Sequence, residues 1–212
     1  MVGLTNITNT ILTDQSIITI VTNMNDKRTQ LIEAAIDLFS KEGFWNTSTA
    51  RISKHAKVAT GTLFNYFPSK EALIDEVYVQ LKHELLIIIQ SNAPTEKNVQ
   101  LHFEYLWQTL ISWGVKNPVR FLLLEQLRLS NLVSEKAQEQ VAVEFQPLLD
   151  LMEAGLKDKV LAETSLDYLV CVMSSNVDAA VKYAINNKLE GESLSDFCNA
   201  SFALLWNGIS AE

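Results

Sequence analysis

The 212-residue sequence is poor in residues that interrupt a helix. It holds seven glycines and four prolines, too few for a collagen-like chain, a disordered chain or a strand-and-turn sandwich. Hydrophobic residues make up 48% of the chain and charged residues 20%, so the apolar side chains are numerous enough to bury a sizeable core. This composition predicts a globular, all-α protein.

Residues that build metal and redox sites are also scarce. Two cysteines, Cys171 and Cys198, cannot form a disulfide framework or a four-cysteine zinc site. They either lie buried as free thiols or meet across the final helices. The three histidines, His55, His83 and His102, stand on different expected helices without metal-ligand spacing. Since no P-loop, catalytic triad or paired-carboxylate motif is evident, we expect no metal, no cofactor and no enzymatic activity.

Long apolar runs are missing as well. None approaches the roughly 20 residues of a membrane-spanning helix, and residues 1–23 lack the basic start and apolar block of a signal peptide. We therefore expect a cytoplasmic protein without a membrane partner. Residues 1–23 carry a single charge, Asp14, and many Thr, Asn and Ile. They are either a disordered N-terminal extension or untranslated, with Met24 as the start.

From residue 25 onward, apolar residues recur at the three- and four-residue spacing of amphipathic helices. The first such segment ends at Gly43, a typical C-terminal stop, and Pro68 separates the third from the fourth, with Thr60 as the expected N-cap of the third. The expected helices after Gly43 are 50–56, 60–67, 70–91, 99–115, 119–129, 134–159, 165–187 and 193–208.

Residues 43–70 contain the most informative pattern. Two short helices joined by a turn near residues 56–58, with a longer helix before them, form a helix-turn-helix. Hydroxyl and carboxamide groups can bind phosphates and base edges, Gly61 permits close backbone approach, and free N–H groups at a helix start favour phosphate. The candidate DNA contacts are Thr47, Ser48, Thr49, Arg51, Lys54, Lys57, Thr60, Gly61, Thr62, Asn65 and Tyr66.

Net charge at first argues against a nucleic-acid partner, because the whole chain carries −8 and phosphate repels an acidic surface. The distribution of charge reverses this argument. Residues 24–70 hold seven basic and four acidic side chains, a net charge of +3, which leaves −11 for the rest. The sequence therefore predicts a basic DNA-binding domain, residues 24–70, on an acidic body.

From residue 28 to residue 73 the sequence resembles the tetracycline-repressor-like (TetR) family of bacterial transcriptional regulators. The resemblance is carried by Leu31, Ala34, Ala35, Leu38, Phe39, Gly43, Phe44, Thr47, Ser48, Ile52, Ala56, Val58, the segment 61–67 (GTLFNYF) and the segment 69–73 (SKEAL). It implies that the positions matching the family's DNA contacts, mostly to phosphate, are Thr49, Thr60, Gly61, Thr62, Phe64, Asn65, Tyr66 and Lys70.

Three positions depart from the family's pattern. Lys57 stands in the turn where glycine is usual, so it must adopt a strained backbone or adjust the turn. Phe64 replaces a common tyrosine and loses a phenolic contact to phosphate. Ser53 replaces an alanine, which is a small change. The base preference of the protein therefore does not follow from the resemblance.

For residues 71–212 the resemblance implies a helical effector-binding and dimerisation domain, whose last two helices pair in a homodimer. The candidate interface is Tyr168, Val172, Leu194, Phe197, Phe202, Leu205 and Trp206. An aromatic and methionine-rich pocket between the middle helices would suit an apolar or aromatic small molecule. Its candidate lining is Leu85, Ile89, Phe103, Trp107, Leu110, Trp113, Phe121, Leu124, Glu125, Met152, Met173 and Asn176. The alternatives are a filled core and a surface pair between Glu125 and Arg128.

The function that these patterns favour is a ligand-responsive DNA-binding regulator. In this interpretation a homodimer represses transcription at a palindromic double-stranded DNA operator, and an effector releases it. The alternative is a helical small-molecule carrier or partner-binding protein whose helix-turn-helix no longer reads DNA.

Overall fold

The computed structural model describes residues 27–211. The expectations for residues 1–23 and for Met24 lie outside these residues. Within the described range the chain forms nine helices: α2 (Lys27–Glu42), α3 (Thr49–His55), α4 (Thr60–Tyr66), α5 (Lys70–Ser91), α6 (Val99–Lys116), α7 (Pro118–Leu129), α8 (Glu135–Lys157), α9 (Leu166–Asn186) and α10 (Gly191–Ile209). The all-α class is confirmed.

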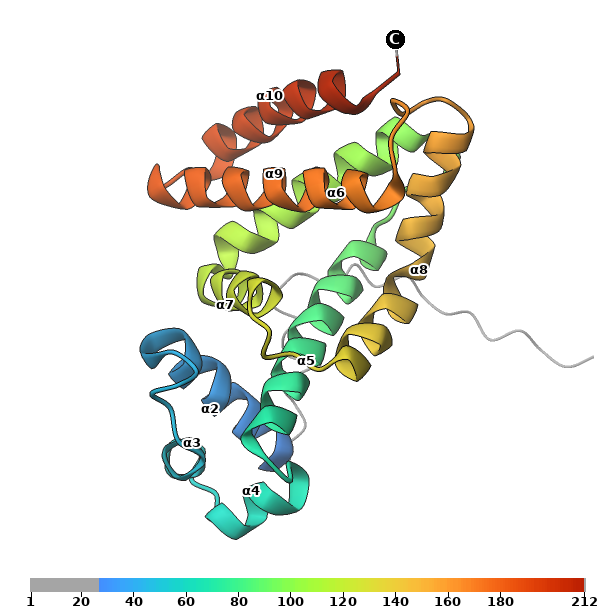
Figure 1. The fold of residues 1–212 in the computed structure, drawn as a ribbon. Helices are drawn as coiled ribbons and strands as arrows, with labels where there is room; N and C mark the ends of the chain where they lie inside the picture. The colour runs from blue at the N-terminus through green and yellow to red at the C-terminus, as the bar shows by residue number, and fades with distance from the viewer. Residues whose placement is uncertain (1–26, 212) are drawn as a thin grey trace, which may run out of the picture.

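Helices α2, α3 and α4 form one end of the molecule (Figure 1). α2 buries Leu31, Ala35 and Phe39 completely, the face that its apolar spacing predicts. It ends at Glu42, and the next residue, Gly43, has φ of +79° and donates its N–H to the Phe39 carbonyl at 2.9 Å. A positive φ at this position favours glycine, since a side chain would crowd the backbone.

The turn between α3 and α4 is closed by backbone hydrogen bonds. Lys57 has φ of +55°, its N–H donates to the Lys54 carbonyl at 3.2 Å, and the Val58 N–H donates to the Ser53 carbonyl at 2.9 Å. The strained backbone expected at Lys57 is therefore present. α4 begins after Ala59, which occupies the N-cap position without a side-chain hydrogen bond. The prediction of Thr60 as the cap is wrong by one residue.

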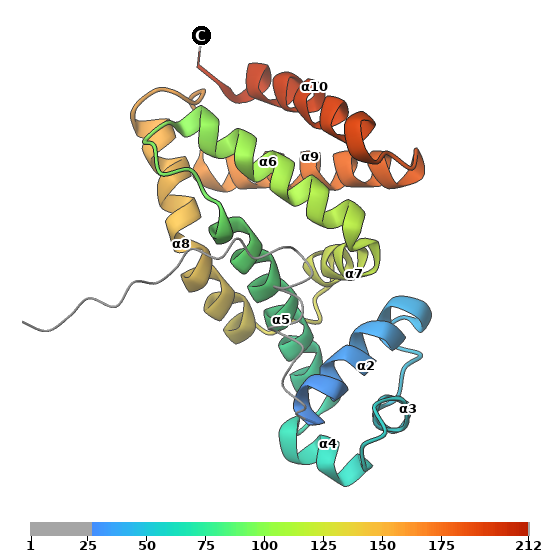
Figure 2. The ribbon, with the colours of Figure 1, turned by 180° about the vertical axis from the view of Figure 1, so that it is seen from behind.

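Helix α5 connects this end to the body. Ser69 caps it, accepting the Ala72 N–H at 3.1 Å, and its 22 residues run from beside α4 upward between α7 and α8 (Figures 1 and 2). α5 contacts α2 as well as α6, α7 and α8. One rigid helix thus spans from the helix-turn-helix to the interior of the body.

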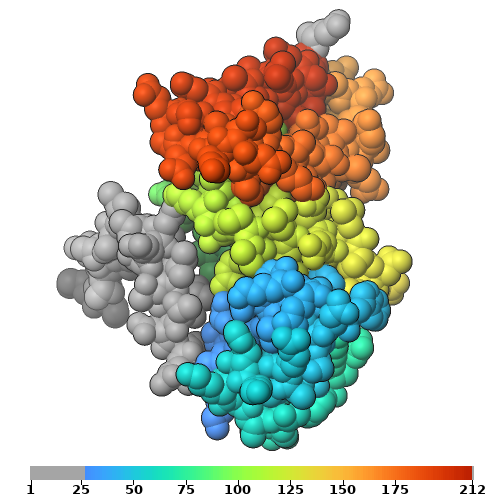
Figure 3. Space-filling model, turned by 90° about the vertical axis from the view of Figure 1, so that its left-hand side faces the viewer, coloured from blue at the N-terminus to red at the C-terminus, as the bar shows by residue number. Residues whose placement is uncertain are grey.

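Helices α6, α9 and α10 form a layer at the far end, where α6 packs against both α9 and α10. Figure 3 shows α9 and α10 at the opposite end of the molecule from α2–α4. An isolated bridge between Leu161 and Ser210 ties the α8–α9 connection to the end of α10. Within residues 27–211, no helix is long and apolar enough to cross a membrane.

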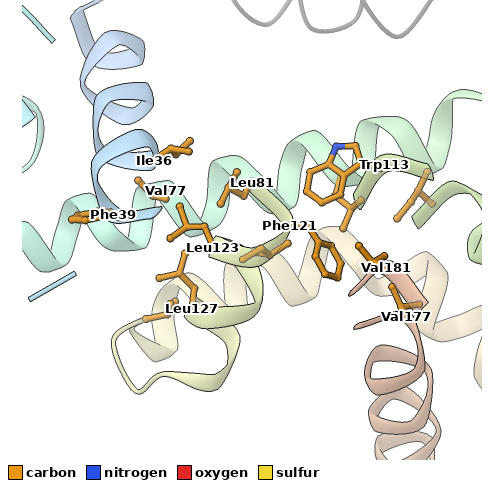
Figure 4. Close-up of a cluster of buried hydrophobic side chains, with 14 of the residues drawn as sticks. Ile36, Phe39, Val77, Leu81, Trp113, Phe121, Leu123, Leu127, Val177 and Val181 are labelled. Carbon is orange, nitrogen blue, oxygen red and sulfur yellow. The ribbon is translucent and has the colours of Figure 1, made fainter. Parts of the chain in front are cut away.

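The core is continuous from the helix-turn-helix into the body. Figure 4 shows Phe39 and Val77 at one end of this cluster and Phe121, Trp113 and Val181 at the other. All five side chains are buried, and the Trp113 and Phe121 rings meet edge to face with centroids 6.5 Å apart. The two parts of the chain therefore share apolar packing through α7.

Candidate nucleic-acid interface and ligand cavity

Helix α4 presents two different faces. Leu63 is fully buried and Phe67 nearly so, whereas Phe64 is 46% and Tyr66 41% exposed. Among the other predicted contacts on α4, Thr62 is half-buried, and Thr60, Gly61 and Asn65 are exposed. The predicted reading face is therefore turned to solvent. Hydroxyl groups, a carboxamide and a glycine backbone are the groups that bind phosphates and base edges.

In the segment before α3, one predicted DNA contact is buried. Thr47 was predicted to face DNA, but it is 1% exposed and its hydroxyl donates to the Gly43 carbonyl at 2.9 Å. Thr47 therefore closes the loop after α2 from inside. Ser48 is exposed and caps α3, its oxygen accepting the Arg51 N–H at 3.3 Å, so its hydroxyl proton can still donate outward. Thr49, the next residue, is half-buried.

The basic side chains predicted to contact DNA differ in whether they have a partner within the chain. The Arg51 guanidinium pairs with Glu42 at 2.5 Å, and the Lys70 ammonium donates to the Phe44 carbonyl, which joins the start of α5 to the loop after α2. Lys54 and Lys57 are exposed, and the described part of the chain supplies no acidic partner to either. These two lysines, one in α3 and one in the turn after it, therefore present positive charge to solvent.

Trp45 is a surface residue that the sequence patterns did not single out. Its side chain is 82% exposed and borders a shallow concavity shared with Phe64 and Lys70. Large aromatic side chains are seldom left in water. The usable signal in the sequence is a bulky aromatic residue in the loop between two expected helices, two residues before the hydroxyl cluster that begins at Thr47.

A cavity of about 780 Å³ opens in the body between α5, α6, α7, α8 and α9. Its volume lies in the range of small-molecule sites. Nine of the predicted pocket residues line it: Leu85, Ile89, Leu110, Trp113, Phe121, Leu124, Glu125, Met152 and Met173. Residues that the predictions missed include Tyr78, Lys82 and Phe145, because their helices' cavity faces depend on how α5 and α8 pack together.

Three predicted pocket residues lie elsewhere. Phe103 is fully buried and its ring meets Trp206 at 5.9 Å between centroids. Trp107 donates its indole N–H to the Ser201 hydroxyl at 3.1 Å. Asn176 is exposed, and its amide donates to the Val172 carbonyl of its own helix at 2.8 Å. Phe103 and Trp107 therefore belong to the α6–α10 packing, and Asn176 to the surface.

The charged residues at the cavity form pairs between helices. Lys182 on α9 binds Glu125 on α7, and Arg128 on α7 binds Asp178 on α9. The alternative pairing of Glu125 with Arg128 is therefore wrong. Burial raises the pKa of Asp178, while the Arg128 guanidinium acts in the opposite direction.

Lys82 lies at the same cavity without such a pair. Its ammonium sits over two aromatic rings that also line the cavity, 5.2 Å from the Phe145 centroid and 6.0 Å from the Tyr78 centroid. Burial lowers the pKa of Lys82, and Arg128 adds to this while Asp178 opposes it. Burial acts in this direction because removing an ammonium from water is costly.

The expected dimer face on α9 and α10 is mixed. Tyr168 is 62% and Leu204 is 78% exposed, whereas the candidates Phe202 and Leu205 are buried in the chain's own core. Phe197 stacks on Tyr183 with centroids 5.0 Å apart. The remaining candidates, Val172, Leu194 and Trp206, are half-buried.

The cysteines and other metal-ligating groups form no centre in residues 27–211. Cys171 is exposed and Cys198 is buried, and both are free thiols. Burial raises the pKa of Cys198, which disfavours the reactive thiolate. No group of three or more His, Cys, Asp or Glu side chains in the described chain is arranged to hold a metal ion.

Comparisons with known proteins agree with this geometry. Residues 31–77 match the family described as bacterial regulatory proteins, tetR family, a match that ends inside α5. The chain is 28% identical over 191 residues to the HTH-type transcriptional regulator UidR of Escherichia coli K12, covering 86% of this chain and 90% of that protein. It is 30% identical over 97 residues to the nucleoid occlusion factor SlmA of Glaesserella parasuis, a match covering 45% of this chain and 48% of that protein.

Among solved structures, a tetR-family transcription regulator from Shewanella sp. PV-4 superposes with a TM-score of 0.82 at 29% identity, covering 88% of this chain and all of that one. A second such regulator, from Marinobacter aquaeolei, shares the fold with a TM-score of 0.79 at 20% identity, over 88% of this chain and 96% of that one. The helix-turn-helix, the exposed face of α4 and these matches lead to one conclusion. Residues 31–77 of this chain form a DNA-binding domain of the tetR family of bacterial regulatory proteins, and the whole chain has the fold of tetR-family transcription regulators.

Proposed function

We propose that this protein is a homodimeric repressor. It binds a palindromic operator in double-stranded DNA through α4, and a small molecule in the α5–α9 cavity releases it. Its place of action is the cytoplasm, where bacterial DNA lies. Two recognition helices one DNA turn apart read the two halves of a palindrome, which is why dimerisation fits this mode of binding.

The observation that carries the proposal is the two-sided character of α4. Leu63 and Phe67 anchor the helix in the core, while Thr60, Gly61, Asn65 and Tyr66 are exposed. We assign base and phosphate contacts to this face and phosphate contacts to Ser48, Thr49 and Thr62. Lys54 and Lys57 supply the positive charge, because each phosphate contact releases condensed counterions.

Trp45 extends this surface toward α2. Its exposed indole borders the same concavity as Phe64, Ser48 and Lys70. An indole N–H is a hydrogen-bond donor that suits a phosphate oxygen. We propose that Trp45 offsets the contact that Phe64, which has no hydroxyl, does not make.

Release by a ligand requires different affinities in the two conformations. A ligand shifts the equilibrium only by its differential affinity for the bound and released forms. Helix α5 carries both cavity residues and the junction with α4, so a shift of α5 against α8 would move α4. The exposed aromatic and aliphatic side chains Tyr168 and Leu204 are apolar surface for pairing α9 and α10 with a second copy.

A gel-shift assay with the protein's own promoter tests the proposal. The wild type should bind an inverted repeat there, and its affinity should fall steeply as salt rises. The variant Asn65→Ala with Tyr66→Ala should lose this binding, whereas Gln140→Ala on α8, also an exposed polar residue, should keep it. Binding of the double variant at wild-type affinity would contradict the assignment of α4 as the reader.

The competing function is a small-molecule carrier that has lost DNA binding. Two observations favour it over a DNA-binding regulator: Lys70 donates to the Phe44 carbonyl, and Arg51 is paired with Glu42, so both cations are partly engaged within the chain. A carrier would bind ligand equally in the wild type and in the Asn65→Ala, Tyr66→Ala variant. It would also show no salt-sensitive binding to any promoter palindrome.

A further inference from the structure

The cavity contains one cation whose charge the described chain leaves without an anion. The Lys82 ammonium faces the Tyr78 and Phe145 rings at 6.0 and 5.2 Å. Within residues 27–211 the Asp178 carboxylate acts on it only from beyond ion-pair distance, and no hydrogen-bond acceptor contacts it. An aromatic face attracts a cation less strongly than an anionic group does. Lys82 is therefore placed to receive an acidic group from outside the chain.

The other ionic groups at the cavity are already neutralised or lie at its rim. Glu125 binds Lys182, and Asp178 binds Arg128. Glu139 and Asp167 also line the cavity, but both are exposed, and water and salt screen exposed charges. A cationic ligand would thus have to break an existing pair and would meet repulsion from Lys82.

Apart from Gln138 and Ser174, most of the remaining lining is apolar, and much of it lies on helices other than α5. Trp113, Phe121, Met152 and Met173 are buried at the cavity wall. Aromatic rings and thioethers pack against flat or chain-like hydrocarbon bodies. An apolar body resting on these side chains can carry an acidic group toward α5.

We propose that the cavity takes an amphipathic anion, a molecule with an apolar or aromatic body and one acidic group that pairs with Lys82. This inference rests on the proposed function, because it specifies the chemical class of the effector. The acidic group compensates the Lys82 ammonium for the hydration that it loses on burial. The apolar body of the ligand is buried against the cavity lining on α6 to α9. Lys82 thereby discriminates an acid from a neutral analogue of equal shape.

Two fluorescent probes with the same body test this inference. Anilinonaphthalene sulfonate carries one anionic group, and N-phenylnaphthylamine lacks it. Titration of the full-length protein should show that Lys82→Met weakens the sulfonate at least about tenfold, the loss of one charge-assisted contact. The same substitution should leave the neutral probe unchanged or tighter. The matched control Lys136→Met, at an exposed position of α8, should change neither affinity.

A cavity-filling variant separates failure of this inference from failure of the proposed function. Leu110→Trp places extra volume in the cavity and should abolish binding of both probes. Equal effects of Lys82→Met on the two probes would overturn the anion class while the effector cavity stands. Failure of Leu110→Trp to reduce either probe, or failure of the wild type to bind either, would overturn the cavity as the effector site. Circular dichroism melts establish that each variant folds, and Lys82→Gln repeats the test with a polar side chain.

Discussion

Arg120 on α7 binds Glu33 on α2 through both carboxylate oxygens, each 2.8 Å from the same guanidinium nitrogen. Its Nε atom also lies 3.5 Å from Glu84 on α5. The neighbouring residue, Phe121, lines the cavity. One side chain therefore links the helix-turn-helix end, the connecting helix and the helix that borders the ligand site.

Removal of this link should destabilise the protein. Arg120→Met leaves Glu33 and Glu84 as neighbouring carboxylates without their cation, and we expect a loss of about 1–2 kcal/mol for a partly buried network. Urea unfolding measures the change. The exposed pair of Lys41 and Asp37 is the control: Lys41→Met should cost less than about 0.5 kcal/mol. Equal losses would mean that Arg120 behaves as an ordinary surface charge.

The pH dependence of stability should contain a contribution from Glu84. Burial raises the pKa of Glu84, while Arg120 and Gln80 oppose the shift and Glu33 adds to it. A carboxyl group whose pKa is higher in the folded state binds protons more tightly there, so stability rises as pH falls from the folded pKa to the unfolded one. Relative to Glu84→Gln, the wild type should gain stability on acidification from neutral pH toward the ordinary carboxyl range near 4.5. Unfolding curves at several pH values check this, and a parallel pH profile for the two proteins would contradict it.

The left-handed backbone at Lys57 should store strain. With φ at +55°, Lys57→Gly relieves the crowding of Cβ and should stabilise the protein by about 0.5–1 kcal/mol. Lys57→Ala removes the same charge but keeps Cβ, so it should show no such gain. Thermal melts of the two variants distinguish strain from charge. In a gel shift both should weaken DNA binding equally, since both remove the same cation.

The close approach of α6 and α9 at Gly114 should not tolerate a side chain. A Cβ added at Gly114 would lie 2.7 Å from Cγ1 of Val181 and 3.1 Å from the Phe121 ring. Gly114→Ala should therefore destabilise the protein by about 1–3 kcal/mol, despite the better helix propensity of alanine. Gly208→Ala on α10, where an added Cβ meets nothing within 4 Å, should be neutral or stabilising. A stable Gly114→Ala variant would show that α6 and α9 can separate readily.

Much of the fold followed from local patterns. Apolar residues at helical spacing predicted the helices, and Gly43 and Pro68 predicted where α2 and α4 end, because these signals act within a few residues of the chain. The errors were local as well. Thr60 lies one residue inside α4 because Ala59 takes the extended cap conformation, and Thr47 turns inward because its hydroxyl reaches the Gly43 carbonyl.

The two candidate sites also differ in how well the sequence predicts them. The exposed face of α4 is legible in the sequence because Leu63 and Phe67 must face the core, which leaves the polar residues outside. The lining of the cavity is harder to predict from the sequence. Phe103 and Trp107 have the composition of a pocket lining, yet the packing of α6 against α10 buries them in a filled core. Sequence composition cannot distinguish the wall of a ligand cavity from a filled hydrophobic core, since the residues of both are apolar.

By itself, the sequence determined that this protein is helical, that it carries a helix-turn-helix, and that positive charge gathers at that end of an acidic chain. The tertiary structure decided which charges meet. Lys182 and Glu125 are 57 residues apart, as Arg120 and Glu33 are 87 apart, and such pairs depend on helix packing across the whole fold. The same packing left Lys82 among aromatic rings without an anion, because every neighbouring carboxylate is paired with another cation or faces water.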